Sequence, residues 1–254
     1  MASNPVIFVT GAAGGVGFAI VRALLEERNA SVVASDIVKG DLEQLQASHS
    51  DKLEVVVGDI TKESTSIVAI SKAVERFGGL TGVCLNAGTF GPCHRLNNAD
   101  PEKWIKAMNV NLFSHLYTLK HAIPHLRKSE GTIIFTTSAA GLQALFPGWG
   151  FYGTSKAAVA FIVKQLQLEE PTLTVLGVAP GLCDTKMIHV LAEGGYDGWT
   201  AEDAKNYKEI SSTWTLTKPA EAGRAYAYAV TKASREIGGS VVEFNDPIIQ
   251  ALLP

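Results

Sequence analysis

Short apolar runs, most of them rich in β-branched residues, alternate with longer helical stretches along nearly the whole chain. The runs are VIFV (6–9), SVVAS (31–35), LEVVV (53–57), TGVCL (81–85), TIIFTT (132–137), LTVLGVA (173–179) and SVVEF (240–244). The helical stretches lie near 15–28, 64–77, 101–127, 151–169 and 219–232. Near-continuous apolar strands are typical of a parallel sheet that is covered on both faces. The alternation therefore predicts an α/β fold: a doubly wound parallel sheet of about seven strands with helices on both faces.

A single domain is expected for residues 1–254. The chain shows no linker, low-complexity tract or internal repeat, and 254 residues can bury a full hydrophobic core. The alternation is interrupted only at 186–218, where the pattern predicts two short helices around a glycine-rich turn. Thr200 and Asp203 have the spacing of a capping box that opens the second helix. This insertion is a candidate substrate lid, and the alternative is a packed surface insertion.

Charge and cysteine content exclude several classes of protein. The net charge is −3 and the basic residues are scattered, which argues against a nucleic-acid or acidic-membrane partner. No run of about 18 apolar residues is present, so no membrane span is expected. Cys84, Cys93 and Cys183 form no C-x-x-C pair, and no His, Cys and carboxylate set has metal-ligand spacing. We therefore expect no metal site, no disulfide framework and a cytoplasmic location.

A glycine-rich turn follows the first predicted strand in VIFVTGAAGGVGFAI, with Gly11, Gly15 and Gly17. Residues without a Cβ let the backbone approach a pyrophosphate, and the free N–H groups of the next helix favour its negative charge. A glycine run alone can be an ordinary turn, but here a strand precedes it, a helix follows it and a second strand ends in Asp36. A P-loop is excluded because no Lys-Ser or Lys-Thr follows the glycines. The pattern indicates a Rossmann-type, dinucleotide-binding sheet.

Asp36 ends the second predicted strand, 19 positions after Gly17. A carboxylate there can accept hydrogen bonds from the ribose hydroxyls of the adenosine half of a cofactor. It would repel the 2′-phosphate of NADP by about 4 kcal/mol per unit charge at about 4 Å and an effective dielectric near 20. Lys39 is the nearby cation that weakens this argument. We therefore expect NAD, with NADP less favoured; the alternative is a solvated turn aspartate.

Tyr152 and Lys156 are four residues apart in the helical stretch GFYGTSKAAVAF, so they share one helix face. A carbonyl that accepts hydride also needs a proton donor, and the reverse reaction needs a base. Using a phenol as a base at neutral pH costs roughly 4 kcal/mol, which one cation within about 4–6 Å can supply. Ser138 ends the run TIIFTTS at the carboxyl edge of the sheet, where its hydroxyl can hold the substrate oxygen. A Tyr-x-x-x-Lys spacing also occurs by chance. The pair indicates a catalytic site only in combination with Ser138 and the glycine-rich turn.

With these motifs in order, the sequence resembles the short-chain dehydrogenase/reductase family over nearly its whole length. The matching motifs are Thr10-Gly-Ala-Ala-Gly-Gly-Val-Gly17, Asp59 in GDIT, Asn86-Ala-Gly88, Asn111 in VNL, Ser138, Tyr152 with Lys156, and Pro180-Gly181 leading to Thr185. The resemblance implies an oxidoreductase that transfers hydride between a nicotinamide cofactor and a secondary alcohol or ketone, with a tyrosine as general acid/base.

The resemblance also implies a role for each matching position. Tyr152 would be the acid/base, and Lys156 would bind the nicotinamide ribose and lower the Tyr152 pKa. Ser138 would orient the carbonyl and Asn111 would hold a relay water, with Asn109 as its rival. The cofactor-binding residues would be Gly11, Gly15, Val16, Gly17, Asp36, Ile37, Asp59, Ile60, Asn86, Ala87, Gly88, Tyr152, Lys156, Pro180, Gly181 and Thr185. Among them, Asp59 would contact the adenine and Thr185 the carboxamide.

Three segments narrow the resemblance further: GWGFYGTSKAA, VAPGLCDTKM and NDPIIQALLP. They resemble the sepiapterin-reductase-like and benzil-reductase-like members, mostly fungal, which reduce ketones and diketones and usually prefer NADPH. The sequence departs from them at the cofactor, because its glycine turn has no basic residue and Asp36 ends the second strand. An NADPH-dependent diketone or carbonyl reductase is therefore the alternative to an NAD(H)-preferring enzyme for apolar or aromatic substrates.

Two alternative functions have weaker support in the sequence. A non-catalytic dinucleotide-binding sensor usually loses the tyrosine or the lysine, and this chain keeps both. A sugar-nucleotide epimerase of the extended branch needs a larger C-terminal substrate domain. The expected small-molecule partner is an alcohol or ketone. The stretches 101–127 and 151–169 are apolar on more than one face, which favours contacts with a partner, and the resemblance implies that this partner is a further copy of the chain, in a homodimer or homotetramer. Candidate residues of an apolar substrate pocket, otherwise core residues, are Phe146, Trp149, Met187, Tyr196, Trp199 and Trp214.

Overall fold

The computed structural model describes residues 4–254, which form one seven-stranded sheet with parallel neighbours throughout. The strands are β1 (Val6–Thr10), β2 (Ser31–Asp36), β3 (Leu53–Val57), β4 (Gly82–Leu85), β5 (Thr132–Thr136), β6 (Thr174–Ala179) and β7 (Val241–Glu243). Their order in the sheet is β3-β2-β1-β4-β5-β6-β7. The winding direction reverses between β1 and β4, so the predicted doubly wound α/β fold is confirmed.

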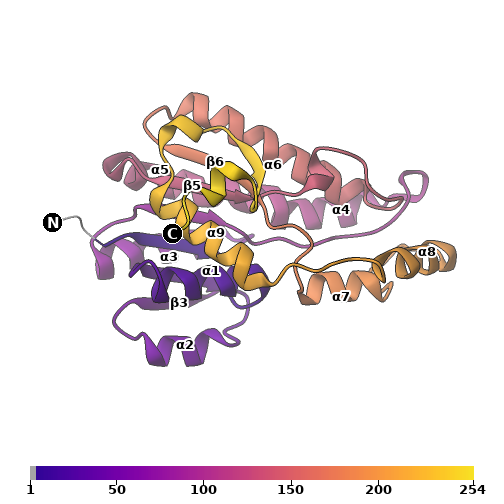
Figure 1. Ribbon diagram of the computed structural model, residues 1–254, viewed down its shortest axis with the longest axis horizontal. Coiled ribbons are helices and arrows are strands. Elements are labelled where there is room, and N and C mark those ends of the chain that lie inside the picture. The colour runs from indigo at the N-terminus through magenta and orange to yellow at the C-terminus, as the bar shows by residue number, and fades with distance from the viewer. Residues whose placement is uncertain (1–3) are drawn as a thin grey trace.

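Helices cover both faces of the sheet (Figure 1). The α-helices are α1 (Gly15–Glu26), α2 (Leu42–Ser48), α3 (Glu63–Phe77), α4 (Pro101–Met108), α5 (Ser114–Ser129), α6 (Gly150–Glu169), α7 (Lys186–Ala192), α8 (Ala201–Ser211), α9 (Pro219–Lys232) and α10 (Pro247–Gln250). Short 3₁₀ turns are η1 (Leu96–Asn98), η3 (Ala139–Gly141) and η4 (Arg235–Ile237). The helix predicted over 101–127 is in fact α4 and α5 joined by a π-helical turn, η2 (Asn109–Phe113). Pro124 lies inside α5, and the helix continues past it to Ser129.

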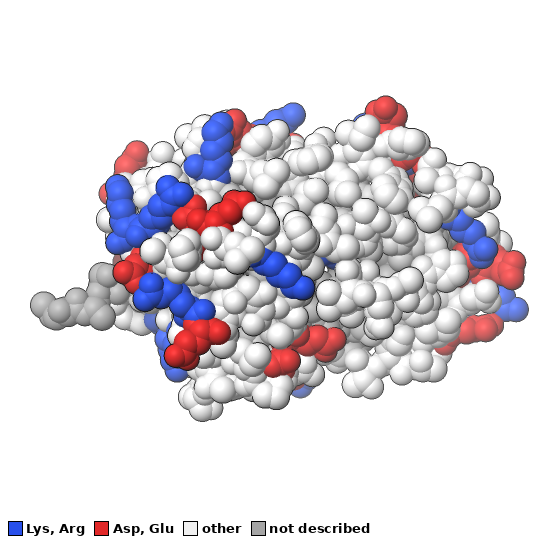
Figure 2. Space-filling view, turned by 90° about the horizontal axis from the view of Figure 1, so that it is seen from above, with Lys and Arg blue, Asp and Glu red and all other residues white. Residues whose placement is uncertain are grey.

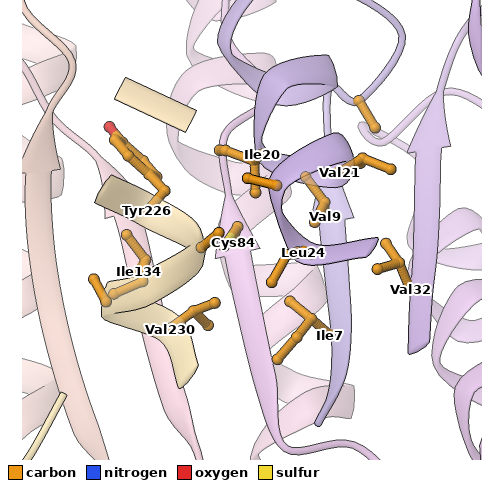
Figure 3. Packing of buried hydrophobic residues seen from close by; sticks show 14 of the residues in the cluster. Ile7, Val9, Ile20, Val21, Leu24, Val32, Cys84, Ile134, Tyr226 and Val230 are labelled. Carbon is orange, nitrogen blue, oxygen red and sulfur yellow. The ribbon is translucent and has the colours of Figure 1, made fainter. Parts of the chain in front are cut away.

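The hydrophobic core lies in two layers, one on each face of the sheet. On one face, Ile20 and Leu24 of α1 and Val230 of α9 pack over Ile7 and Cys84 of β1 and β4 (Figure 3). On the other face, the buried side chains come from α3, α5 and α6. The central strands β1, β4 and β5 are buried on both sides over almost their whole length, which explains why these runs show no polar alternation.

The segment that carries α7 and α8 extends away from the sheet, to the right-hand end of Figure 1. Its second helix opens with the predicted capping box: the Thr200 hydroxyl accepts from the Asp203 N–H, and the Asp203 carboxylate accepts from the Thr200 N–H. Arg95 also binds the Asp203 carboxylate, at 2.6 and 3.3 Å. Lys103 forms an ion pair with Asp197. These contacts join the segment 186–218, the candidate substrate lid, to the loop after β4 and to α4. The segment is called the lid below for brevity, and its role as a lid stays a prediction.

Residues 4–254 contain no helix that is long and apolar enough to cross a membrane. This part of the chain also contains no group of three or more His, Cys, Asp or Glu side chains that could hold a metal ion. Cys84, Cys93 and Cys183 are free and buried.

Candidate active site

A cavity of about 820 Å³ opens beside the glycine turn, lined by the segments that follow β1 to β6. This is the switch point of the sheet, where ligands bind in doubly wound folds, and the volume is in the range of cofactor sites. The predicted residues that line it are Gly11, Gly15, Val16, Asp36, Ile37, Asp59, Ile60, Asn86, Ala87, Gly88, Tyr152, Lys156, Pro180, Gly181 and Thr185. Gly17, Asn111 and Ser138 are not among its lining residues, and their roles must be judged from their contacts.

The glycine turn is shaped by close backbone contacts. Gly11 has φ +64°, and a Cβ there would lie 2.7 Å from Ala87 Cα. A Cβ on Gly17 would lie 1.9 Å from the carbonyl oxygen of Gly11. Gly17 therefore lets α1 pack closely on the turn instead of facing a ligand. Gly14, which precedes α1, has open space around the position of a Cβ and lines the cavity. The free N–H groups of α1 thus face the cavity at the position where a pyrophosphate would bind.

Asp36 reaches from the end of β2 toward the glycine turn. One carboxylate oxygen accepts from the Ala13 N–H at 2.9 Å, and the other accepts from the Ile37 N–H at 2.7 Å. A carboxylate has about four lone-pair sites, so acceptor capacity remains on the side that lines the cavity. Lys39, the cation expected to weaken the repulsion of a phosphate, lies 3.2 Å from the Glu43 carboxylate. Its charge is therefore partly compensated.

A chain of hydrogen bonds links the glycine turn to the opposite end of the cavity. The Asn86 amide donates to the carbonyl oxygen of Gly11 at 3.0 Å, and its oxygen accepts from the Thr136 hydroxyl at 3.3 Å. The Lys156 ammonium in turn donates to the carbonyl oxygen of Thr136 at 2.7 Å. Asn86 therefore supports the floor of the cavity by joining β1, β4 and β5. Asn86 lines the cavity, and its predicted contact with a cofactor stays a prediction. Its side-chain hydrogen bonds show that it supports the glycine turn.

Tyr152 lies in the first turn of α6 with its ring held on one side by an aromatic neighbour. The Phe90 ring stacks on it, with centroids 4.5 Å apart and an angle of 18° between the planes. Burial raises the pKa of Tyr152, and the neighbouring Ser138 hydroxyl acts in the opposite direction. Desolvation of the phenol has the larger effect, so the pKa of Tyr152 lies above its usual value. The predicted lowering by Lys156, together with a bound nicotinamide, stays a prediction. Ser138 itself accepts from the Ala140 N–H at 3.2 Å and so starts η3.

Lys156 is 3% exposed, although its ammonium lines the inner wall of the cavity. Burial lowers its pKa from the usual 10.5 to about 8. Its nitrogen lies 5.8 Å from the centroid of the Tyr152 ring, which agrees with the predicted sharing of one helix face. The hydrogen bond to Thr136 fixes the ammonium above the end of β5.

Asn111 is completely buried in the π-helical turn η2. Its amide oxygen accepts from the Thr89 N–H at 2.8 Å, and its amide nitrogen donates to the carbonyl oxygen of Thr89 at 2.8 Å and to the Ser155 hydroxyl at 3.0 Å. The side chain therefore joins the loop after β4 to α6, and π-helical turns are frequent at functional sites. The predicted water relay at Asn111 stays a prediction. Its rival, Asn109, lines the cavity.

A cluster of aromatic side chains extends from Tyr152 to the lid, and it includes all six candidate pocket residues. Its buried members are Phe90, Cys93, Ala140, Trp149, Leu191 and Tyr207, against which pack Phe146, Tyr152, Met187, Ile188, Tyr196, Trp199 and Trp214. This set is called the aromatic cluster below. One wall comes from the loops after β4 and β5 and from α6, and the other comes from the lid. The cluster surrounds the phenol with apolar surface.

A family model described as short chain dehydrogenase matches residues 5–194. The chain belongs to the short-chain dehydrogenase family. As a member, it is an oxidoreductase that transfers hydride between a nicotinamide cofactor and an alcohol or ketone.

Individual relatives cover nearly the whole chain. An uncharacterized oxidoreductase of Schizosaccharomyces pombe is 33% identical over 96% of this chain and 97% of its own. The benzil reductase ((S)-benzoin forming) of Saccharomyces cerevisiae is 29% identical over 95% of this chain and 96% of its own. The crystal structure of a short chain dehydrogenase/reductase from Saccharomyces cerevisiae matches with a TM-score of 0.90 and 29% identity, covering 98% of this chain and 100% of that one.

Some residues that line the cavity were not predicted from the sequence. Gly14, Thr89, Val110 and Ile188 all line the cavity. Gly14 lies within the glycine turn, and Thr89 directly follows the Asn86-Ala-Gly88 motif, so proximity to a motif was the available signal. Val110 and Ile188 carry no polar group or special spacing, and only the tertiary structure brings them to the site.

The buried ammonium leads to a prediction about stability. Lys156→Met is expected to raise the free energy of unfolding at pH 7 by about 2 kcal/mol. The lowered pKa of Lys156, about 8 against 10.5, means that the unfolded chain binds more protons than the folded chain between these pH values. This group therefore destabilises the fold by about 3 kcal/mol below pH 8, and the penalty disappears as the pH rises toward 10.5. The variant avoids the penalty but loses the hydrogen bond to Thr136, worth about 1 kcal/mol.

Urea unfolding of both proteins at pH 7 and pH 10 measures this effect. The stability difference between variant and wild type should shrink at pH 10. Lys164→Met, at an exposed lysine on the same helix, is the matched control and should show no such pH-dependent gain. A difference for Lys156→Met that is the same at both pH values would contradict the argument.

Proposed function

We propose that this protein is an NAD(H)-preferring ketone reductase or secondary-alcohol dehydrogenase for apolar, aromatic substrates. The observation that carries the cofactor preference is the Asp36 carboxylate, which lines the cavity at the end of β2. Its hydrogen bonds to Ala13 and Ile37 hold it in place, and the nearby Lys39 is paired with Glu43. A 2′-phosphate at this position would meet a negative charge with little compensation.

The residues around the cavity fit a nicotinamide dinucleotide. The glycine turn leaves space at Gly14 and directs the N–H groups of α1 toward the cavity. Asp36 and Asp59 line the cavity just after β2 and β3, where the adenosine half would bind, and Tyr152 and Lys156 line it from α6. Thr185 lies beside Gly15 of the glycine turn. When bound there, the cofactor would supply or accept the hydride. The proton chemistry would belong to the side chains of this chain.

In the proposed mechanism the phenol of Tyr152 gives its proton to the ketone oxygen during reduction and takes it back during oxidation. The Ser138 hydroxyl would hold the same oxygen beside the phenol. The Lys156 ammonium, fixed by Thr136, would bind ribose hydroxyls and stabilise the phenolate that forms. A positive charge beside a buried phenol is needed here, because burial alone raises the pKa of Tyr152. Asn109 or Asn111 would hold the water through which a replacement proton reaches Tyr152.

The aromatic cluster supports the substrate class. Phe90 stacks on the Tyr152 ring, and Trp149 meets the same ring edge to face with centroids 6.1 Å apart. A substrate carbonyl at the phenol would therefore have its substituents among aromatic and aliphatic side chains, which favours an apolar, ring-containing molecule. The relative named benzil reductase is consistent with this substrate class.

An absorbance assay of the nicotinamide tests the proposal. The wild type is expected to reduce aryl ketones with a higher kcat/KM for NADH than for NADPH, measured side by side on one panel of aryl ketones, diketones and secondary alcohols. Turnover mainly with NADPH would contradict the proposal that Asp36 confers a preference for NADH. It would favour the alternative, an NADPH-dependent carbonyl reductase. Cofactor binding without turnover on the whole panel would favour the dinucleotide-binding sensor.

Further copies of the chain are the proposed macromolecular partner, as a homodimer or homotetramer. Apolar side chains are exposed on η2, α5 and α6: Phe113, Leu116, Tyr117, Phe161 and Leu168. Figure 2 looks onto the molecule from the top of Figure 1, where α6 lies, and its central area carries few charged side chains. An exposed apolar surface of this kind favours association. Light scattering coupled to size-exclusion chromatography tests it, and a monomer at micromolar concentration would contradict it.

A further inference from the structure

His115 is a buried histidine that the proposed mechanism does not use. Its side chain lies in the first turn of α5 and is 1% exposed. Within residues 4–254, the Nε2 atom of its ring has no hydrogen-bond partner. Folded proteins pair the great majority of buried polar groups, because an unpaired one is unfavourable. A buried imidazole with an orphaned nitrogen therefore calls for an explanation.

Three observations place His115 close to Lys156 and Asn111. It follows Asn111 by four residues, about one helical turn. Its ring meets the Phe135 ring edge to face with centroids 5.7 Å apart, and the next residue, Thr136, accepts from the Lys156 ammonium. Burial and the positive charge of Lys156 lower the pKa of His115 to about 3. The imidazole is therefore neutral at physiological pH.

The neighbours of the imidazole determine which of its nitrogens carries the proton. The Nδ1 atom lies 3.5 Å from the Ser114 hydroxyl oxygen. The Ser114 hydroxyl gives its one proton to the carbonyl oxygen of Val110, at 2.6 Å. It can therefore only accept from the ring, so Nδ1 carries the proton and Nε2 keeps its lone pair. The orphaned nitrogen is thus an acceptor that lacks a donor.

A small space beside Gly88 is bordered by the groups that could use this acceptor. A Cβ built on Gly88 would lie 3.5 Å from the Asn111 Oδ1 atom and 3.8 Å from the Lys156 Nζ atom. The Oδ1 atom accepts from the Thr89 N–H and has a second lone pair. The ammonium has three protons, and one of them binds the end of β5. Together with His115, the space offers a water one donor and two acceptors, which are the three hydrogen bonds of a typical buried water.

We propose that His115 is a positioning residue of the active site, whose Nε2 atom, with the Asn111 oxygen, holds a water that accepts from the Lys156 ammonium. These hydrogen bonds favour the charged form of Lys156 against the burial that lowers its pKa. His115 thus acts through Lys156, the cation that stabilises the phenolate of Tyr152. This effect on the reaction rests on the proposed function, whereas the hydrogen bonds do not.

NMR titration of protein labelled with ¹³C at the lysine ε-carbons measures the pKa of Lys156, whose signal is the one lost in Lys156→Met. His115→Met keeps a side chain of similar size without the acceptor, and we expect it to lower this pKa by about one pH unit. His115→Gln keeps an acceptor and should stay within about 0.3 of the wild type. The matched control is His125→Met, at a half-buried histidine on α5. An equal pKa in the wild type and His115→Met would overturn the proposal.

The tautomer of His115 gives a second test in the wild type itself. Correlation of the ring nitrogens with the ring protons by ¹⁵N NMR distinguishes Nδ1–H from Nε2–H, and the signals of His115 are those that disappear in His115→Gln. The Nδ1–H form is expected. The Nε2–H form would make this nitrogen a donor and would overturn the proposal, however well His115→Met folds.

Kinetics connect the positioning role to the reaction. No charged side chain of the described residues shifts the pKa of Lys156, which burial lowers to about 8, and the titratable Tyr152 ring lies 5.8 Å away. At pH 8 about half of the Lys156 side chains are charged, against about a tenth if the pKa is one pH unit lower. We therefore expect kcat for reduction of an aryl ketone to be about fivefold lower in His115→Met at pH 8, and nearly equal to the wild type at pH 6.

His115→Gln should restore kcat at pH 8, and His125→Met should leave it unchanged. A loss in His115→Met that persists at pH 6, or that His115→Gln does not restore, would show a general packing defect and overturn the positioning role. If the wild type reduces no ketone, the proposed function fails, and the two NMR measurements still decide whether His115 holds the water at Lys156.

Discussion

Replacing Tyr152 with phenylalanine is expected to lower kcat by about 10³-fold and to leave the dissociation constant of NADH within about twofold. The phenylalanine ring keeps the stacking contact with Phe90 and the packing of α6. Lys156 keeps its hydrogen bond to Thr136. The substitution therefore removes one hydroxyl, and with it the group that exchanges a proton with the substrate oxygen. Stopped-flow reduction of an aryl ketone and a fluorescence titration with NADH measure the two quantities.

The control for this variant is a hydroxyl removed elsewhere. Tyr117→Phe, at the exposed tyrosine on α5, should keep the kcat of the wild type. A Tyr152→Phe enzyme that retained more than about a tenth of kcat would show that another group donates the proton. Loss of NADH binding together with kcat would instead mean that the hydroxyl supports the cavity.

Asp36→Ser is expected to lower the ratio of kcat/KM for NADH over NADPH by about 100-fold. The substitution removes an acceptor for the ribose hydroxyls and a negative charge beside the position of the 2′-phosphate. At about 4 Å and an effective dielectric near 20, the repulsion is about 4 kcal/mol per unit charge. Asp36 is half-buried, so solvent screens part of this and about 2–3 kcal/mol remains. The loss of hydrogen bonds to Ala13 and Ile37 lowers activity with both cofactors alike.

Asp59→Asn is the matched control, because Asp59 is a second carboxylate that lines the same cavity. The hydrogen bonds from Thr61 stabilise its charged form and lower the pKa of Asp59, so the substitution also removes a full negative charge. The cofactor ratio should stay within about threefold if the charge at Asp36 alone recognises the ribose. An equal change of the ratio in both variants would indicate a general effect of net charge.

The fold was predictable because its sheet is buried on both faces. Strands such as β1 and β6 are buried at every position and consist mostly of apolar residues, so their runs are conspicuous and their bounds agree with the prediction to within two residues. Helices α2 and α10 were missed because they have seven and four residues, too short for a periodic signal. The π-helical turn η2 was missed because Asn109–Phe113 fits the same pattern as a continuous helix, and only the contacts of Asn111 reveal the interruption.

The site was predictable where chemistry demands particular residue types at set spacings. Gly11, Gly15, Asp36, Tyr152 and Lys156 line one cavity, whereas Gly17 lets α1 pack closely on the glycine turn. What the sequence could not predict depends on tertiary packing. The stacking of Phe90 on Tyr152 joins segments about sixty residues apart, and the raised pKa of Tyr152 follows from the desolvation that this packing produces.

The hydrogen-bond chain through Asn86 has a consequence for engineering the enzyme. It runs from the Gly11 carbonyl through Thr136 to Lys156 and so connects β1, β4 and β5. Asp36 stands outside it, on the opposite side of β1 and bound to Ala13 and Ile37. The residues that we propose for cofactor choice and for proton transfer thus belong to separate hydrogen-bond groups. We therefore expect substitutions at the end of β2 to alter the preference between NADH and NADPH without disturbing the hydrogen bond that positions Lys156.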